Sequence, residues 1–429
     1  MRYLNGQGMP RNAEESFRWF RKAAEQGLGL AELNVGRMYA DGQGTTRNDV
    51  EAVKWYRLAA GKDLPLAQYY LGRMYADGRG VSRDERESLQ WFRRAAEQNL
   101  PLAQLELADN YLSGRGVVLD EAIGMQLLAR AAGGGSAEAQ LRLAERYFAG
   151  RGVPKDGRTG LDWLRKAAEQ GHSEAQYRLG TLYAKGENLG RDDRQAAEWY
   201  RKAAEQGHAV SQFQLAGMYV NGAGVPRDDR QAVQWFREVA RQGNAEAEFN
   251  IGVLYAAGRD MPRDEAQAAA WYRKAAEHGL AVAQLNLGLM YADGRGGLPR
   301  DEAQAVVWYR KAADRNLALA QVMLGLSYAT GRGVPRDDRQ AYGWFEKAAS
   351  GGFPLAQYAV GMLYSNGRGV EPDWISAHMW LSLAVAGGYV GAAQPLDNAT
   401  SRLNEADLAR ARQLARQWRP TVGRDVRQN

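Results

Sequence analysis

Cysteine is absent from the 429-residue chain, and histidine is scarce. Without cysteine there is no disulfide framework, no thiolate metal site and no cysteine nucleophile. The four histidines, His172, His208, His278 and His378, form neither an HExxH pattern nor a pair with a nucleophile in the sequence. We therefore predict no metal, no cofactor and no catalytic residue, and we expect that the protein is not an enzyme.

Long apolar runs and a large excess of one charge are also lacking. No segment approaches the ~18 apolar residues of a membrane-spanning helix, so we predict no integral membrane segment. The net charge is +6, and basic and acidic residues alternate within each repeated unit. Nucleic-acid binding needs a basic stripe with interleaved aromatic residues, so we predict no nucleic-acid partner. Seven arginines between residues 402 and 429 leave two interpretations, a basic terminal helix or a docking patch for an anion.

Aromatic residues, in contrast, recur with a fixed period. A tryptophan returns every 36 residues, with one inserted residue after Trp271 and a leucine, Leu127, in the fourth unit. A tyrosine keeps the same period from Tyr3 to Tyr364. Self-similarity of this kind is typical of stacked repeat arrays. The tryptophan column consists of Trp19, Trp55, Trp91, Trp163, Trp199, Trp235, Trp271, Trp308, Trp344 and Trp380.

One unit, residues 211–246, illustrates the local structure that the repeat encodes. Apolar residues follow helical spacing over 211–220 and again over 230–241, and a glycine-rich loop with one proline separates the two segments. The unit is therefore a pair of helices, which we name helix A and helix B. We predict an all-α fold: an α-α superhelix, a right-handed solenoid of about eleven 36-residue helix-turn-helix repeats. The predicted parts are a solenoid over 1–402, a capping helix over 403–419 and a flexible tail over 420–429, with a weak point near 120–160.

Polar caps and small residues mark the same positions in each unit. Asp or Asn precedes every helix B and is expected to cap it through the side chain. A helical glycine costs about 1 kcal/mol relative to alanine, so a glycine column inside helix A indicates that a neighbouring backbone passes too close for a Cβ atom. We expect the tryptophan and tyrosine columns to fill the core. The glycine column is Gly36, Gly72, Gly180, Gly252, Gly288, Gly325 and Gly361.

These motifs, seen in residues 281–296 and 198–207, resemble the Sel-one-like repeat family over nearly the whole chain. The resemblance implies a TPR-like α-solenoid that acts as a scaffold or adaptor for partner proteins. It leaves open a β-lactamase-like or other hydrolase, although members of that subgroup carry paired cysteines that this chain lacks. It also leaves open a scaffold for envelope or polysaccharide assembly.

The family's fold implies that helix A lines the concave face, so its variable positions are the candidate partner-binding residues. One column lies two residues before the glycine column and another lies one residue after it, and positions three apart share a helix face. The charged early units and apolar late units predict a groove in two parts for a protein or peptide segment, in a protein that we expect to be a monomer. The alternative is that the second column is buried between neighbouring A helices. The candidates are Arg37, Tyr70, Arg73, Arg142, Arg178, Asn250, Val253, Asn286, Leu289, Met323, Leu326 and Met362.

The N-terminus leaves the compartment open. The first residues lack the apolar core of a signal peptide, and Tyr3 already occupies a position of helix A. One interpretation is that upstream sequence with an export signal is missing, which would make the protein periplasmic or secreted. The other is that the start is mis-set or engineered and the protein is cytoplasmic.

Overall fold

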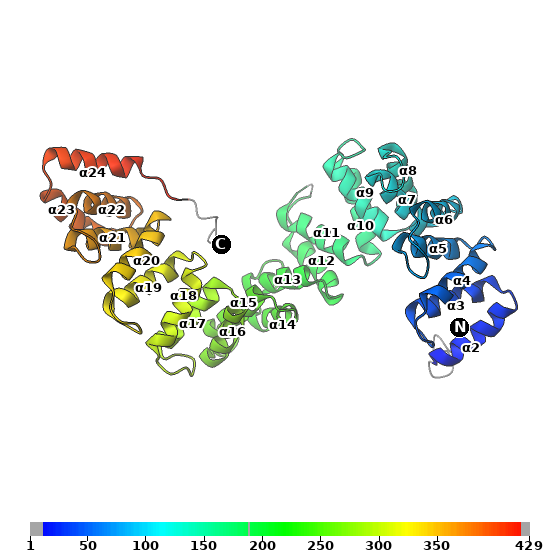
Figure 1. Cartoon of the computed structure of the whole chain (residues 1–429), viewed down its shortest axis with the longest axis horizontal. Coiled ribbons are helices and arrows are strands. Elements are labelled where there is room, and N and C mark those ends of the chain that lie inside the picture. The colour runs from blue at the N-terminus through cyan, green and yellow to red at the C-terminus, as the bar shows by residue number, and fades with distance from the viewer. Residues whose placement is uncertain (1–11, 188, 422–429) are drawn as a thin grey trace. The chain divides into compact units, whose positions relative to one another are not determined.

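The computed structural model describes residues 12–187 and 189–421. Every regular element in these ranges is a helix, and successive helices pack as antiparallel pairs (Figure 1). The chain forms two compact units, Met1–Ser211 and Gln212–Asn429. The all-helical repeat architecture confirms the predicted fold class. The predicted position of Tyr3 and residues 422–429 of the predicted tail lie outside the described ranges.

The first unit contains the helix pairs of the early repeats. Each of its helices spans 12 or 13 residues. They are α2 (Ala13–Glu25), α3 (Gly29–Asp41), α4 (Asp49–Ala60), α5 (Pro65–Asp77), α6 (Glu85–Glu97), α7 (Pro101–Ser113), α8 (Glu121–Gly133), α9 (Ala137–Ala149), α10 (Gly157–Glu169), α11 (Ser173–Lys185) and α12 (Asp193–Glu205).

Helix α13 (Ala209–Asn221) includes the division between the units, and the second unit continues with the later pairs and a C-terminal cap. Odd numbers from α3 to α21 are A helices, and even numbers from α2 to α22 are B helices. The remaining elements are α14 (Asp229–Ala240), α15 (Ala245–Ala257), α16 (Glu265–Glu277), α17 (Ala281–Asp293), α18 (Glu302–Ala313), α19 (Ala318–Thr330), α20 (Asp338–Ser350), α21 (Pro354–Asn366), α22 (Trp374–Ala386), η1 (Val390–Ala392), α23 (Ala393–Ser401) and α24 (Glu405–Gln417).

Side-chain caps fix where each helix B begins. The side chain of Asn12 accepts from the backbone N–H of Glu15 at 3.0 Å, and every corresponding residue of the later B helices makes an equivalent bond. Helix A ends at a glycine with left-handed backbone, such as Gly78 with φ +66°. The predicted caps at both ends of the loop are confirmed. The full set of B-helix caps is Asn12, Asn48, Asp84, Asp120, Asp156, Asp192, Asp228, Asp264, Asp301, Asp337 and Asp373.

The glycine column inside helix A faces an aromatic ring, which corrects the prediction of a neighbouring backbone. A Cβ atom on Gly36 would lie 2.7 Å from the ring of Tyr56 on the following helix B, whereas the nearest backbone atom would lie at 3.3 Å. Five later glycines of the column repeat this geometry, for example Gly72 against Phe92, and the last, Gly361, faces Leu381. Glycine therefore makes room for a ring that is itself almost fully buried.

The second glycine of several loops lies against the backbone at the start of the preceding helix B. A Cβ atom on Gly80 would lie 2.2 Å from the carbonyl oxygen of Asp49, the first residue of the preceding helix B. The adjacent Arg79 donates two hydrogen bonds to the carboxylate of the same Asp49, at 2.7 and 3.3 Å. Equivalent pairs join Arg259 to Asp229 and Arg368 to Asp338. We call this arrangement the loop clamp.

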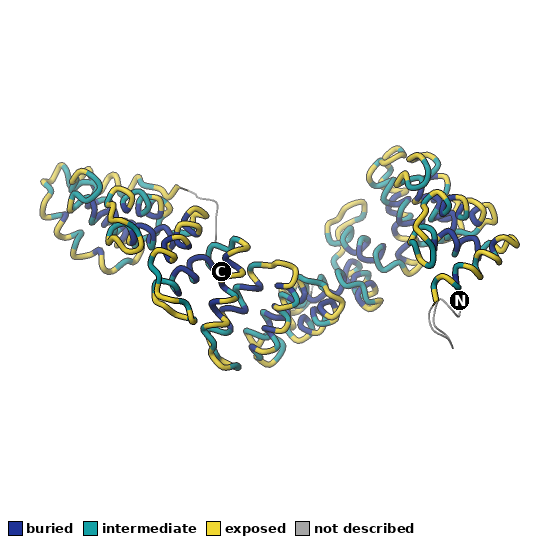
Figure 2. The backbone as a smooth tube through the Cα atoms, turned by 60° about the horizontal axis from the view of Figure 1, so that its bottom comes forward, coloured by how far each residue is buried: buried dark blue, intermediate teal, exposed yellow. Residues whose placement is uncertain are grey.

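The tryptophan column is only partly in the core. Trp308 and Trp380 are buried, but Trp19 is 54% exposed and the other members are half-buried. A lysine three residues later covers the outer face of several rings, as Lys202 does over Trp199 at 3.9 Å from the centroid. In five half-buried members, Trp91, Trp163, Trp199, Trp271 and Trp344, a lysine or arginine lies over the indole ring. Figure 2 shows the buried residues lining the facing sides of the helix pairs in each unit.

The C-terminal cap closes the last repeat. Helices α23 and α24 both pack on α22, and Trp418, at the end of α24, lies with its ring 6.1 Å from that of Trp380. The backbone N–H of Thr421 donates to the carbonyl oxygen of Ser350 at 2.8 Å. Helix α23 ends at Ser401, and α24 spans Glu405–Gln417. The domain boundaries as a whole remain predictions.

Candidate partner-binding surface

The two predicted columns of helix A meet across successive repeats of the first unit. The residue after the glycine position in one repeat contacts the residue before it in the next repeat, 33 positions later. Arg73 Nη1 lies 3.4 Å from Glu106 Oε1, and Arg142 Nη1 lies 2.6 Å from Asp109 Oδ1. We call the surface formed by the two columns of helix A, in either unit, the A-face; in the first unit it runs over α3, α5, α7, α9 and α11.

Three arginines of the A-face each hold two carboxylates, and we call each group an arginine bridge. In the first bridge Arg73 contacts Glu106 of the next repeat and Asp77 of its own helix, at 3.4 and 3.5 Å. In the second, Arg142 contacts Asp109 and Glu138. The third has the same form. It consists of Arg178, Glu145 and Glu174.

The bridges carry more negative than positive charge. Each contains two carboxylates and one guanidinium, so each has one excess negative charge. Burial raises the pKa of Glu106, whereas burial of Glu138 is outweighed by hydrogen bonds from Arg142 and His172, which lower its pKa. The side chains are about one-third to one-half exposed. Bridges at this exposure contribute little to stability, but they set the charge that a partner meets.

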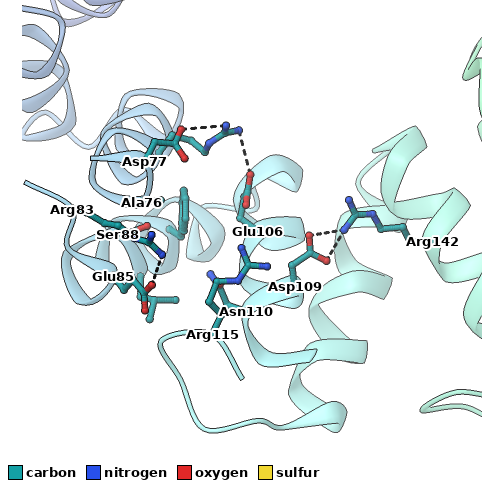
Figure 3. Close-up of a pocket in the computed structure, with 13 residues that line it drawn as sticks. Ala76, Asp77, Arg83, Glu85, Ser88, Glu106, Asp109, Asn110, Arg115 and Arg142 are labelled. Carbon is teal, nitrogen blue, oxygen red and sulfur yellow. Dashed lines mark hydrogen bonds and ion pairs between the residues drawn. The ribbon is translucent and has the colours of Figure 1, made fainter. Parts of the chain in front are cut away.

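A polar pocket of about 610 Å³ lies between the first two bridges. Figure 3 shows Arg142 directed toward Asp109 of α7, with Glu106 of the same helix and Arg115 of the following loop nearby. Four arginines and four carboxylates line this pocket, so its charge is balanced. The predicted residues Arg73 and Arg142 are therefore brought together around one cavity. The charged lining residues are Arg73, Arg83, Arg115, Arg142, Asp77, Glu85, Glu106 and Asp109.

Arg37 and Tyr70 form a separate contact at the start of the A-face. The Arg37 guanidinium lies 5.8 Å from the centroid of the Tyr70 ring, and that ring stacks on Tyr56 at 5.4 Å. Arg37 is exposed and Tyr70 is half-buried. The pair extends the A-face by a cation and an aromatic edge, without a carboxylate partner for Arg37 among the described residues.

In the second unit the same positions are largely apolar and differ in exposure. Val253 and Leu326 are 38% and 43% exposed. Leu289 and Met323 are half-buried against the cluster formed by α17, α18 and α19. The prediction of accessible apolar residues therefore holds for Val253 and Leu326.

Three further predicted residues of the second unit are less available. Met362 is half-buried. Asn250 is also half-buried, and the Asn286 amide donates to the carbonyl oxygen of Val282 in its own helix at 2.8 Å. Partial burial, the alternative for the second column, thus describes Leu289 and Met362.

Sequence reasoning missed the carboxylates that complete the bridges. Asp77, Glu138 and Glu174 lie in neither column, but each is four residues from the arginine that it contacts. Their spacing of four residues from an arginine, which is typical of ion pairs on a helix, could have identified them in the sequence.

Three histidines join neighbouring repeats in the same region of each repeat. His172 Nε2 lies 3.0 Å from Glu138 Oε2, His208 Nε2 lies 3.2 Å from Glu174 Oε2, and His278 Nδ1 lies 2.7 Å from Glu248 Oε2. The part of the chain that the structure describes holds no group of three or more side chains suited to a metal ion. Among the described residues, no helix has both the length and the apolar character needed to cross a bilayer.

The stacked helix pairs, their caps and the A-face define a TPR-like helical repeat protein, a fold commonly used for protein–protein interaction. The Sel1 repeat pattern matches eleven segments, and the chain therefore belongs to the Sel1 repeat family. The matched residues are 1–28, 29–63, 65–100, 101–136, 137–172, 173–208, 209–244, 245–280, 281–317, 318–353 and 354–389.

Two solved structures of bacterial proteins are similar over most of the chain. One is c5321, a protective antigen of uropathogenic Escherichia coli strains with an SLR fold, at 34% identity; the match covers 97% of this chain and 89% of that one, with a TM-score of 0.76. The other is a Sel1 repeat protein from Oxalobacter formigenes, at 37% identity over 72% of this chain and 89% of that one, with a TM-score of 0.55. A search of curated proteins finds no match.

Proposed function

We propose that the protein is a non-catalytic adaptor that binds segments of partner proteins on the A-faces of its repeats. The observation that carries the proposal is the polar pocket of about 610 Å³, because Arg73, Glu106, Asp109 and Arg142 in its lining lie at helix A positions that vary between repeats. The helices around it are fixed by caps and tight packing, so a partner would meet a preformed surface and would lose little free energy in ordering it.

The second unit offers a complementary apolar surface. Val253 and Leu326 expose side chains at positions where the first unit carries charged groups. Exposed apolar residues on a repeat surface favour contact with apolar side chains of a partner. We therefore propose that charged and apolar parts of partner segments bind to different units.

In-cell crosslinking followed by affinity capture and mass spectrometry tests this function. We compare the wild type with the double variant Val253→Arg/Leu326→Arg, and the matched control is Val307→Arg, which changes an equally exposed apolar residue on helix B. Partners captured by the wild type and the control but lost from the double variant would support the adaptor function. Equal capture by all three proteins would argue against an apolar A-face site, and no specific capture by any of them would argue against the adaptor function.

A second candidate is an assembly scaffold in the bacterial envelope. It is favoured by the similarity to the protective antigen c5321, since a protective antigen must be accessible to host immunity. Immunoblotting of separated cytoplasmic, periplasmic and outer-membrane fractions tests this candidate. Recovery in the cytoplasmic fraction alone would exclude it.

A further inference from the structure

A second cavity of about 260 Å³ lies between α9 and α11, beside the third arginine bridge. Its walls include Ala144, Phe148, Leu164 and Leu182. Its rim is the ion-paired group of Glu145, Arg178 and Glu174. We call this cavity the α9–α11 slot. It combines an apolar interior with a charged opening on the A-face.

The slot lies in one of two repeats in which alanine and leucine occupy the positions of the glycine and the aromatic ring; the other repeat carries Ala108 and Leu128. In the next repeat, a Cβ atom on Gly180 would lie 2.8 Å from the Tyr200 ring, so the ring occupies the space that a larger residue would need. In the repeat that forms the slot, the corresponding residues are Ala144 and Leu164. Both residues line the cavity. The protein's own ring is therefore missing from this position of helix B.

The same repeat carries an aromatic residue on helix A, Phe148, which packs against a glycine of helix B. Phe148, at the end of α9, packs so closely on Gly160 that a Cβ atom there would lie 3.0 Å from the ring. Phe148 forms one wall of the cavity and leaves the opening toward Arg178 accessible. This arrangement therefore produces an apolar recess that is continuous with the A-face.

The charge at the opening of the slot indicates which residues a partner segment would carry next to the side chain that enters it. Arg178 Nε donates to Glu174 at 2.6 Å, and the same guanidinium also pairs with Glu145. His208 Nε2 approaches the other oxygen of Glu174 at 3.2 Å. The opening thus carries one excess negative charge when His208 is neutral. The second arginine bridge, one repeat earlier, also carries one.

We infer that the α9–α11 slot binds an aromatic side chain of a partner protein segment that has lysine or arginine next to that aromatic residue. This inference rests on the proposed adaptor function and specifies the chemistry of its partner. The ring would take the space that the ring of Tyr200 occupies in the next repeat. The adjacent cation would meet the excess carboxylates of the rim, which also favours a faster encounter at low salt.

The test begins with random heptapeptides displayed on phage and selected on the full-length protein. We expect enrichment of sequences in which Phe, Tyr or Trp is adjacent to Lys or Arg. One enriched peptide is then synthesised with a fluorescent label, and its Kd is measured by anisotropy at low and high salt. Enrichment of sequences without this pairing would overturn the inference.

Variants then locate the binding site. Ala144→Gly/Leu164→Tyr restores the arrangement of Gly180 and Tyr200, and we expect it to keep the helical circular dichroism signal and to weaken peptide binding at least tenfold. The matched control Ala108→Gly/Leu128→Tyr makes the same exchange one repeat earlier, outside the slot, and should leave the Kd unchanged.

A second variant, at the surface, tests the slot without changing the core and so covers the case in which Ala144→Gly/Leu164→Tyr misfolds. Thr181→Met narrows the opening from the A-face at a position where other repeats carry Leu289 and Met362, and we expect it to weaken binding in the same direction. An unchanged Kd in both slot variants would overturn the inference. The adaptor function would still be decided separately, by the crosslinking comparison of Val253→Arg/Leu326→Arg.

Discussion

Replacing Gly369 with alanine should destabilise the second unit far more than the same change at Gly297. Both glycines have left-handed backbone, with φ +75° and +73°. A Cβ atom on Gly369 would lie 2.1 Å from the carbonyl oxygen of Asp338, whereas nothing lies within 4 Å of a Cβ atom on Gly297. Since real Cβ atoms essentially never come within 3.0 Å of such an atom, the loop of Gly369 would have to move by about 1 Å.

The magnitude follows from two contributions. The left-handed backbone costs a non-glycine residue about 1–2 kcal/mol at either position. At Gly369 the shift also pulls Arg368 away from Asp338, and hydrogen bonds from Arg368 and then Arg336 lower the pKa of Asp338 from 3.8 to about 2. A difference of this size corresponds to at most about 2 kcal/mol. We therefore expect losses of about 3 kcal/mol for Gly369→Ala and about 1 kcal/mol for Gly297→Ala.

Urea unfolding of the purified protein, followed by circular dichroism and tryptophan fluorescence, measures both losses. Asp338→Asn removes the clamp on its own, and combining it with Gly369→Ala should give less than the sum of the two single effects, because both act on the same contact. Equal losses for Gly369→Ala and Gly297→Ala would refute the argument, since only Gly369 has the close backbone contact and the neighbouring pair of Arg368 with Asp338.

Three further predictions concern pH, buried hydroxyl groups and local opening. Because the folded-state pKa of Asp338 is lowered to about 2, its contribution is complete above the unfolded pKa and is lost as the pH falls from about 4 to about 2; acid titration of the unfolding free energy should show this loss in the wild type and not in Asp338→Asn. The Tyr309 hydroxyl is buried without a hydrogen-bond partner, whereas that of Tyr342 has two, so thermal melting should show Tyr309→Phe stabilising and Tyr342→Phe destabilising by about 1 kcal/mol each. Hydrogen exchange should be fastest, apart from the chain ends, over residues 120–160, and uniform protection along the chain would contradict the predicted weak point.

The fold could be predicted because the sequence of each repeat contains the residues that begin and end its helices. The capping residues and the loop glycines act within one helix or loop, so their effect is local and periodicity is enough to identify them. The partner of Gly36 could not be predicted in the same way. Its contact is a ring from the next helix, and the sequence pattern shows that a Cβ atom is excluded without showing which group excludes it.

The candidate site was predictable as a set of positions but not as a set of contacts. Arg142 and Glu145 share a helix face, yet Arg142 contacts Asp109 of the preceding repeat and Glu138 of its own. The offset between neighbouring repeats decides these pairs, and it depends on how the helices pack, which one repeat alone does not encode. For the same reason the excess negative charge of the bridges was not evident from a chain with a net charge of +6.

The glycines at 124 and 160 show how a departure from the pattern can be misread. Their low helical propensity near the start of α8 and α10 is the ground for the weak point near 120–160, which stays a prediction. In the structure each accepts a large neighbour, because a Cβ atom on Gly124 would lie 2.6 Å from Leu112, and Phe148 packs on Gly160 in the same way. Size exchange between paired positions therefore accounts for these residues, and propensity alone does not.

The arginine bridges have a consequence for how such a chain can evolve. Each bridge joins an arginine of one repeat to a carboxylate of a neighbouring repeat, whereas the caps and core contacts of a helix pair are repeated in similar form along the chain. Duplication or loss of a whole repeat through recombination would thus preserve the helices at any junction. It would preserve the surface charges only where the new neighbours match. The surface charges therefore depend on the order of the repeats. Duplication of a repeat could lengthen the solenoid and keep its helices while it changes the charges that a partner would meet.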